Sequence, residues 1–163
     1  MTVDDAEVLV GTVAEGFETF RTWAPPGWTV GDAGFSLPDM REGVARPTVW
    51  GLIAEDAGQA AGHVMFLQAR ERVEPRAEIP GLAHLWQLFV RPEWWGGGLA
   101  ARLNGLAVEE AGRQGYERMR LFTPAGNLRA RGFYEREGWS TDGVATFEAH
   151  LGQDMVQYTR ALP

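Results

Sequence analysis

The feature that most constrains this chain is a run of three glycines between an apolar segment and an amphipathic one. In the stretch LWQLFVRPEWWGGGLAARL, the apolar run ends at Val90, a turn contains Pro92, and the glycines occupy positions 96–98. The first amides of a helix have no partners within the helix and lie at the positive end of its dipole. Glycine lets the backbone come close to a ligand. A strand, glycine loop and helix in this order therefore predict a phosphate or pyrophosphate site.

Two nucleotide-binding motifs are alternatives to be weighed against this segment. A P-loop needs lysine followed by serine or threonine after its second glycine, and neither is present. A dinucleotide fingerprint is matched loosely by Gly96, Gly98 and Ala101. It also needs an acidic residue at the end of the next strand, which here reads Phe122-Thr123-Pro124. The dinucleotide interpretation is therefore disfavoured.

Periodicity predicts one domain over residues 1–163, of the α/β (α+β) class with a mixed central sheet and flanking helices. Ala6, Val13 and Phe17 recur at helical spacing, and the following Pro25-Pro26 pair ends that helix. Gly138 suits the left-handed position just after a helix. Between 28 and 47 only a short helix after Ser36 is expected, and 70–81 reads as a charged loop. The predicted helices are 4–22, 98–113 and 127–137, and the predicted strands are 49–54, 61–67, 82–90, 117–123, 144–150 and 155–161.

Composition excludes several classes of site and partner. The chain has no cysteine, so disulfides, thiolate metal sites and a cysteine nucleophile are ruled out, and no metal is expected. The net charge of −7 disfavours nucleic acid, and suits either a cationic substrate or simple solubility. No apolar run is long enough for a membrane span, and the acidic start Met1–Asp5 is unlike a secretory signal. A cytoplasmic protein that uses neither membrane nor nucleic acid is the expectation.

Two segments resemble the signatures of the GNAT acetyltransferase family. Trp95–Ala100 is similar to the family's pyrophosphate motif, Gln/Arg-x-x-Gly-x-Gly/Ala, and Leu88–Glu93 resembles the strand and turn before it. The second signature, an Asn and Ala before Phe-Tyr and then Gly with an aromatic residue, is matched in Asn127–Trp139. The order and spacing also fit, so the resemblance covers nearly the whole chain. It implies an N-acetyltransferase fold with a mostly antiparallel sheet that splays at the cofactor site. Trp95 departs from the family pattern, which has Arg or Gln there.

The resemblance implies acetyl-CoA as co-substrate and assigns residues to it. The main chain of Phe89 and Val90 would pair with the pantetheine arm, as an added strand does, and the loop amides would hold the pyrophosphate. Asn127 would contact the pantetheine or simply cap a helix, and Phe133 would pack near the cofactor or in the core. The residues assigned to the cofactor are Leu88, Phe89, Val90, Trp95, Gly96, Gly97, Gly98, Leu99, Ala100, Asn127, Ala130, Phe133 and Tyr134.

The resemblance also implies two catalytic residues. Tyr134 matches the tyrosine of the family's Phe-Tyr pair and would give a proton to the leaving sulfur, although a packed aromatic ring is the alternative. Strand alternation places His84, Trp86, Leu88 and Val90 on one face, where some family members carry a glutamate base. His84 titrates in a useful range, but it is equally read as an idle histidine. The amide of Val90 would serve the oxyanion.

The acceptor is the part of the function least visible in the sequence. An amine of a small molecule or peptide is expected, in a pocket that the family builds from the regions of Trp23, Trp28, Phe35, the 70–78 loop and Phe147. His63 and His150 are expected to be structural or surface residues. Relatives often dimerise, so a homodimer is an open expectation. The alternative function is a non-catalytic acyl-CoA-binding module that senses the cofactor or regulates a partner.

Overall fold

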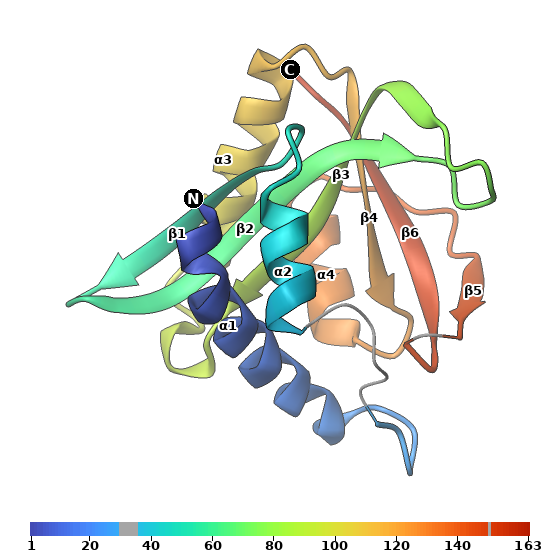
Figure 1. The fold of residues 1–163 in the computed structure, drawn as a ribbon. Coiled ribbons are helices and arrows are strands. Elements are labelled where there is room, and N and C mark those ends of the chain that lie inside the picture. The colour runs from blue at the N-terminus through green and yellow to red at the C-terminus, as the bar shows by residue number, and fades with distance from the viewer. Residues whose placement is uncertain (30–35, 150) are drawn as a thin grey trace.

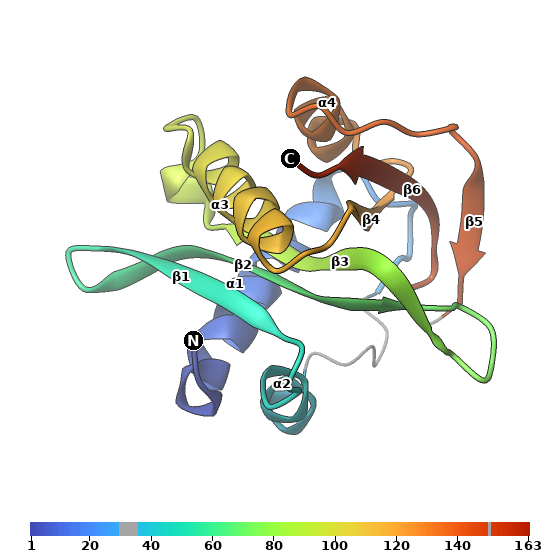
Figure 2. The same ribbon diagram turned by 90° about the horizontal axis from the view of Figure 1, so that it is seen from above.

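A six-stranded sheet with helices on both faces forms the framework of the protein (Figures 1 and 2). The computed structural model describes residues 1–29, 36–149 and 151–163. The strands are arranged in the order β1-β2-β3-β4-β6-β5. Their bounds are β1 Trp50–Asp56, β2 Gln59–Arg70, β3 Glu78–Val90, β4 Arg118–Pro124, β5 Ala145–Glu148 and β6 Gln153–Ala161.

The pairing of β3 with β4 sets the shape of the sheet. All other neighbouring strands pair antiparallel, whereas β3 and β4 run parallel. Their contact is short, because only Leu82–His84 pairs with Arg118–Arg120. Beyond His84 the two strands separate, so one edge of β3 has no strand beside it. The predicted splay in a mostly antiparallel sheet is therefore confirmed.

Helices α1 (Ala6–Glu18) and α2 (Leu37–Val44) cover one face of β1–β3 (Figure 2). Leu9, Val13 and Met40 are buried there against Met65. Glycine is required at two points of this contact. A Cβ on Gly16 would lie 2.2 Å from the ring of Phe89, and one on Gly43 would lie 2.3 Å from the ring of Trp86. The glycines that lower helix propensity thus let both helices approach the aromatic side chains of β3.

Helices α3 (Leu99–Arg113) and α4 (Leu128–Arg136) lie on the opposite face (Figure 2). The apolar stripe of α3 is buried against the sheet with Phe66 and Tyr158. The indole N–H of Trp139, just after α4, donates to Asn104 Oδ1 on α3 at 3.1 Å and ties the two helices together. Gly138 ends α4 with φ 81°, in the predicted left-handed conformation. The stripe of α3 consists of Leu103, Ala107, Val108 and Ala111.

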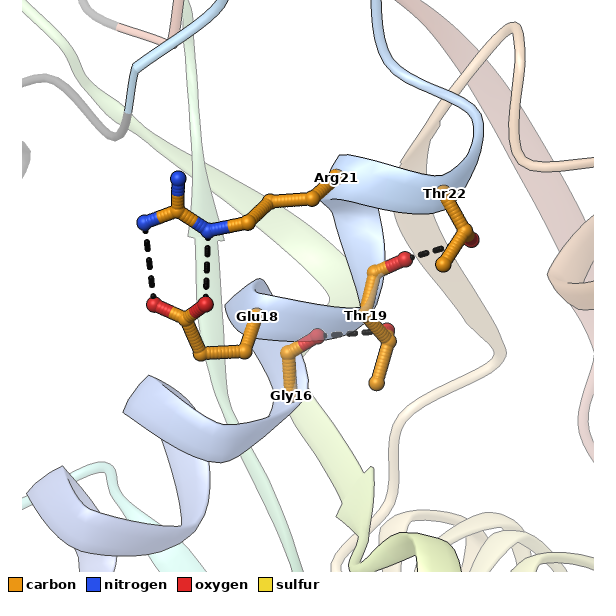
Figure 3. Close-up of polar contacts among 5 residues, drawn as sticks. All are labelled: Gly16, Glu18, Thr19, Arg21 and Thr22. Atoms are coloured by element: carbon orange, nitrogen blue, oxygen red, sulfur yellow. Dashed lines mark hydrogen bonds and ion pairs between the residues drawn. The ribbon is translucent and has the colours of Figure 1, made fainter.

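A 3₁₀ turn, η2 (Thr19–Thr22), continues α1 at its carboxyl end (Figure 3). The Thr19 hydroxyl donates to the Gly16 carbonyl at 2.6 Å, and the Thr22 hydroxyl donates to the Thr19 carbonyl at 2.7 Å. Arg21 pairs with Glu18 on the exposed side, with its Nε 2.6 Å from the carboxylate. The Gly16 carbonyl also accepts the Thr19 backbone N–H, so the threonine hydroxyls add to the backbone bonds at the end of α1. Two further short turns are η1 (Val3–Asp5) and η3 (Pro92–Trp94).

Most predicted elements are present, and the differences concern their ends. Strand β2 is longer than predicted, and β3 begins at Glu78 instead of 82 because Glu78 pairs with Arg70 across the hairpin. The short helix predicted after Ser36 is present as α2, and the Ser36 side chain caps it. Strand β5 ends at Glu148. Among the described residues, none of the helices has the length and apolar character that a membrane crossing demands.

Candidate functional site

A cleft of about 1160 Å³ opens where β3 and β4 separate. We call one end the glycine-loop half: the end of β3, the loop 95–98, and the starts of α3 and α4. The other end, the arginine half, is formed by the 70–76 loop and the side chains of His84, Arg120 and Phe122. All residues predicted to contact the cofactor line the cleft except Gly97, and so does His84.

The glycine-loop half presents main-chain donors. Gly96 and Gly98 have φ of 84° and 79°, a region that favours glycine, and no atom lies within 4 Å of a Cβ built on either. Within the described residues, no backbone acceptor is found for the N–H groups of residues 96–101. Leu99 opens a helix of 15 residues, so these donors lie at its positive end. The loop therefore has the space and the unpaired donors that a pyrophosphate needs.

Trp95 closes the loop against β3 and carries a cation. Its indole N–H donates to the Val90 carbonyl at 2.7 Å, which holds the loop at the edge of the strand. The guanidinium of Arg129 lies 3.6 Å from the Trp95 ring centroid. Arg129 is exposed in the first turn of α4, where the helix dipole disfavours a positive charge. That unfavourable position was the available sequence signal for Arg129, to which the sequence analysis gave no role.

The main-chain groups of β3 differ in the direction they face. The Arg91 N–H donates to the Ala61 carbonyl, so this N–H points toward β2. Successive residues of a strand alternate, so the N–H and C=O of Val90 point to the edge that β4 leaves free. The Phe89 carbonyl lies toward β2, 2.6 Å from a Cβ built on Gly62. The expected pairing edge is therefore offered by Val90, whereas Phe89 turns its main chain away from it.

A β-bulge in β3 overturns the predicted face of His84. Gln87 pairs with Met65 and Leu85 with Phe66, which leaves Trp86 as an extra residue. Trp86 consequently packs with α1 and α2, whereas Leu88 and Val90 pack on the α3 side. The prediction that His84, Trp86, Leu88 and Val90 share one face is wrong, because an inserted residue reverses the alternation on which it rested.

His84 lies in the arginine half, beside β4. Its Nδ1 is 3.3 Å from the Arg120 carbonyl oxygen, so Nδ1 carries the proton in the neutral ring and Nε2 keeps a lone pair. Its ring centroid is 5.6 Å from that of Phe122. Burial, with the positive charge of Arg120, lowers the pKa of His84 to about 4. The imidazole is therefore neutral at physiological pH with a free lone pair, but it does not titrate in the neutral range expected from the sequence, and it is a weak base in these surroundings.

Tyr134 stands in the glycine-loop half, on α4. It is half-buried, and its ring packs near Phe133, Trp139 and Tyr158 at centroid distances of 5.2, 5.9 and 6.0 Å. Burial raises the pKa of its hydroxyl. Within the described part of the chain, no residue forms a hydrogen bond with that hydroxyl. The ring is thus fixed by packing while its O–H remains available to a ligand.

Asn127 and Phe133 show that the two alternatives for each are compatible. Asn127 caps α4, because its Oδ1 accepts from the Ala130 N–H at 3.0 Å. The same side chain lines the cleft and keeps its NH₂ group as a donor. Phe133 is half-buried and also lines the cleft. Capping and packing fix these side chains in place without removing them from the cavity.

The expected acceptor region is only partly assembled as predicted. Trp23 lines the cleft, but the Trp28 indole donates to the Leu151 carbonyl at 2.8 Å and its ring packs in the α1–α2 core. Phe147 is 63% exposed and lies outside the lining. Phe35 and His150 fall outside the described residues.

His63 is buried, as expected of a structural residue, with its Nε2 2.8 Å from Gln87 Oε1. No group of three or more His, Cys, Asp or Glu side chains suited to a metal ion occurs in 1–29, 36–149 or 151–163. The described cleft therefore presents main-chain donors, one histidine, one tyrosine and several arginines.

Comparison with known proteins places this geometry among acetyltransferases. The sequence model of the acetyltransferase (GNAT) family matches residues 17–139. PaiA N-acetyltransferase from Thermoplasma acidophilum in complex with coenzyme A superimposes with a TM-score of 0.71, at 17% identity over 97% of this chain and 94% of that one. Ribosomal-protein-alanine N-acetyltransferase from Brucella melitensis gives 0.74, at 18% identity over 99% and 97%. An acetyltransferase of the GNAT family from Staphylococcus aureus Mu50 gives 0.74, at 13% over 98% and 94%. No curated protein matches the sequence significantly.

Proposed function

We propose that this chain, which belongs to the acetyltransferase (GNAT) family, transfers the acetyl group of acetyl-CoA to a primary amine of a small molecule or peptide. The observation that carries the proposal is the row of N–H groups at 96–101, which have no acceptor in the described chain and belong to a segment that, apart from Gly97, lines a cleft beside the free edge of β3. A phosphate ester seated there explains the glycines, the helix start and the splay together.

The residues of the glycine-loop half suit coenzyme A in distinct ways. The amides from Gly96 to Ala101 would hold the pyrophosphate, and the cation of Arg129 would add a charge that Trp95 itself lacks. The Val90 carbonyl, which accepts the Trp95 indole N–H through one lone pair, would accept an amide N–H of the pantetheine arm through the other, with the Asn127 NH₂ group as a further donor. The bound thioester supplies an activated acyl group.

Acetyl transfer requires two proton movements. The neutral amine nitrogen bonds to the acyl carbon as the carbon–sulfur bond breaks, the nitrogen then loses one proton and the sulfur gains one. An ammonium group must lose a further proton to solvent before it can attack. An alkylamine has a pKa near ~10.4, so most of it is protonated at neutral pH. Nε2 of His84 is the proposed acceptor of the amine proton, directly or through water, since the neutral ring has a lone pair there. The Tyr134 hydroxyl is the proposed donor to sulfur, and the Val90 N–H the proposed oxyanion partner.

The experiment that tests this function combines binding and turnover. Titration calorimetry should detect coenzyme A binding, and incubation with acetyl-CoA and a panel of amines should release free thiol. Binding with no turnover on any amine would favour the non-catalytic acyl-CoA module. Absence of coenzyme A binding in folded protein would remove the proposal altogether. We also propose a cytoplasmic location, where acetyl-CoA is made and a chain without cysteine needs no oxidising compartment.

A further inference from the structure

Arg120 is a buried cation in the arginine half without a counter-charge. Its side chain comes from β4, is 8% exposed and lines the cleft. One terminal nitrogen donates to the Arg70 carbonyl, while Nε has no hydrogen-bond partner. Among the described residues it forms no ion pair. A buried charge left unpaired is costly, so a partner brought by a ligand would be favoured.

A second arginine lies near Arg120, on the ring of Phe122. The guanidinium groups of Arg72 and Arg120 lie 4.8 and 5.4 Å from the ring centroid of Phe122. Glu148 pairs with Arg72, so the charge of Arg72 is balanced and that of Arg120 is not. Glu71 also lines this end and attracts Arg120 at longer range, yet burial still lowers the pKa of Arg120.

Arg120 differs from the other arginines of this half because it has no carboxylate partner among the described residues. The net charge of −7 favours, as a composition, a cationic ligand or no particular ligand. The one charge in this half that calls for an anion is therefore that of Arg120. The other three arginines are each paired: Arg70 with Glu78, Arg72 with Glu148 and Arg76 with Glu74.

We propose that the acceptor is an amine that also carries a carboxylate, and that the guanidinium of Arg120 binds this carboxylate from the cleft. A guanidinium matches a carboxylate in shape and charge better than any other side chain. Phe122 would pack against the apolar part of the same molecule. This inference rests on the proposed function, since it names the acceptor class for that reaction.

The position of Arg120 also links acceptor binding to the proposed base. The His84 ring and the Arg120 guanidinium both lie beside Phe122, at 5.6 and 5.4 Å from its ring centroid, so a carboxylate held by Arg120 would place its amine in the neighbourhood of His84. The positive charge of Arg120 is one cause of the lowered pKa of His84, after burial. An anion on Arg120 offsets that charge and makes His84 a stronger base while the acceptor is bound.

The test uses matched amines that differ only at the carboxylate: amino acids, their amides and their decarboxylated amines. With coenzyme A bound, calorimetry and thiol release should favour the best amino acid over its amide by roughly tenfold or more. In Arg120→Gln that preference should vanish while coenzyme A affinity stays unchanged. Arg118→Gln is the control, because Arg118 lies two residues earlier on β4, is exposed, and is outside the cleft.

Each outcome separates this inference from the proposed function. Coenzyme A binding with equal use of acids, amides and decarboxylated amines overturns the carboxylate acceptor and leaves acetyl transfer intact. Preference for a phosphate-bearing amine over every carboxylate also overturns it. If Arg120→Gln does not fold, the wild-type comparison of matched amines still decides. Loss of coenzyme A binding in the wild type removes the proposed function itself.

Discussion

The two halves of the cleft are built from different parts of the chain. In the glycine-loop half the donors are main-chain N–H groups at 96–101, held by positive φ at Gly96 and Gly98. In the arginine half the groups proposed to act are side chains, above all His84 and Arg120, brought together from two strands that pair for only three residues.

This difference teaches which changes each half tolerates. A site made of backbone depends on conformation and accepts unusual side chains, and so Trp95 occupies a position where the family has Arg or Gln. A site made of side chains depends on the identity of each residue and on the register that aims it. Substitutions that alter backbone conformation should therefore damage the first half, and conservative side-chain changes the second.

Tyr134→Phe gives the largest expected effect, and it tests whether the glycine-loop half also depends on one side chain. Removing the proposed donor to sulfur should lower kcat roughly 100-fold, with little change in coenzyme A affinity because the ring still packs. Tyr116→Phe is the control, since Tyr116 packs on the α3-side core outside the cleft. Equal kcat in wild type and Tyr134→Phe would refute the acid assignment.

His84→Gln breaks the arginine half at its proposed base. We expect kcat to fall on the order of 10- to 100-fold at neutral pH while coenzyme A binding is unchanged. The deficit should shrink as pH rises toward the amine pKa near ~10.4, because the amine then needs no base. Measurement of kcat across pH decides this, and a deficit that stays constant with pH assigns His84 a structural role.

Gly98→Ala and Gly115→Ala form a matched pair for the backbone-built half. Both glycines have positive φ, 79° and 87°, and open space around a built Cβ, but only Gly98 lies in the cleft. Both variants should lose about 1–2 kcal/mol in free energy of unfolding. Only Gly98→Ala should weaken coenzyme A binding, by roughly tenfold. Equal binding in the two variants would show that the loop conformation does not hold the cofactor.

Arg129→Gln measures how much a side chain adds to the backbone-built half. Removing the cation over Trp95 should weaken coenzyme A about fivefold, and the loss should diminish at high salt. Calorimetry at two ionic strengths, with Arg118→Gln as control, provides the measurement. A loss as large as that of Gly98→Ala would show that the contrast between the halves is overstated.

The smallest expected effect is the loss of unfolding free energy as the pH falls. It compares His63, a histidine of the packed core, with His84, a histidine of the cleft. Burial lowers the pKa of both His63 and His84 to about 4, whereas an unfolded histidine titrates near ~6.5. The unfolded state therefore binds more protons between these values, and stability falls as pH drops through that window. From pH 7 to 6 each histidine should cost under about 1 kcal/mol. The free energy of unfolding, measured by denaturant at several pH values, should change less with pH in His63→Asn and in His84→Gln than in the wild type.

The contrast also separates what could be read from the chain from what could not. Gly96–Gly98 after an apolar strand predicted the phosphate-type loop, because a helix start and glycine conformation are local properties. The Asn127 cap and the Gly138 end of α4 were likewise local, and the structure has both. The free edge of β3 was predicted from the family resemblance, and the spacing of residues in the sequence did not indicate it.

The sequence by itself determined the strand–loop–helix unit, the class of fold and the residues that cap its helices, since backbone preference acts over a few neighbouring residues. Only the tertiary structure decided the bulge at Trp86, the face that His84 occupies, the cation of Arg129 over Trp95, and the unpaired Arg120. These depend on register and on contacts between residues far apart in the chain. The alternation of apolar residues in a strand does not reveal where a bulge inserts a residue. Whether a charged side chain has a partner is known only once the fold has placed its neighbours.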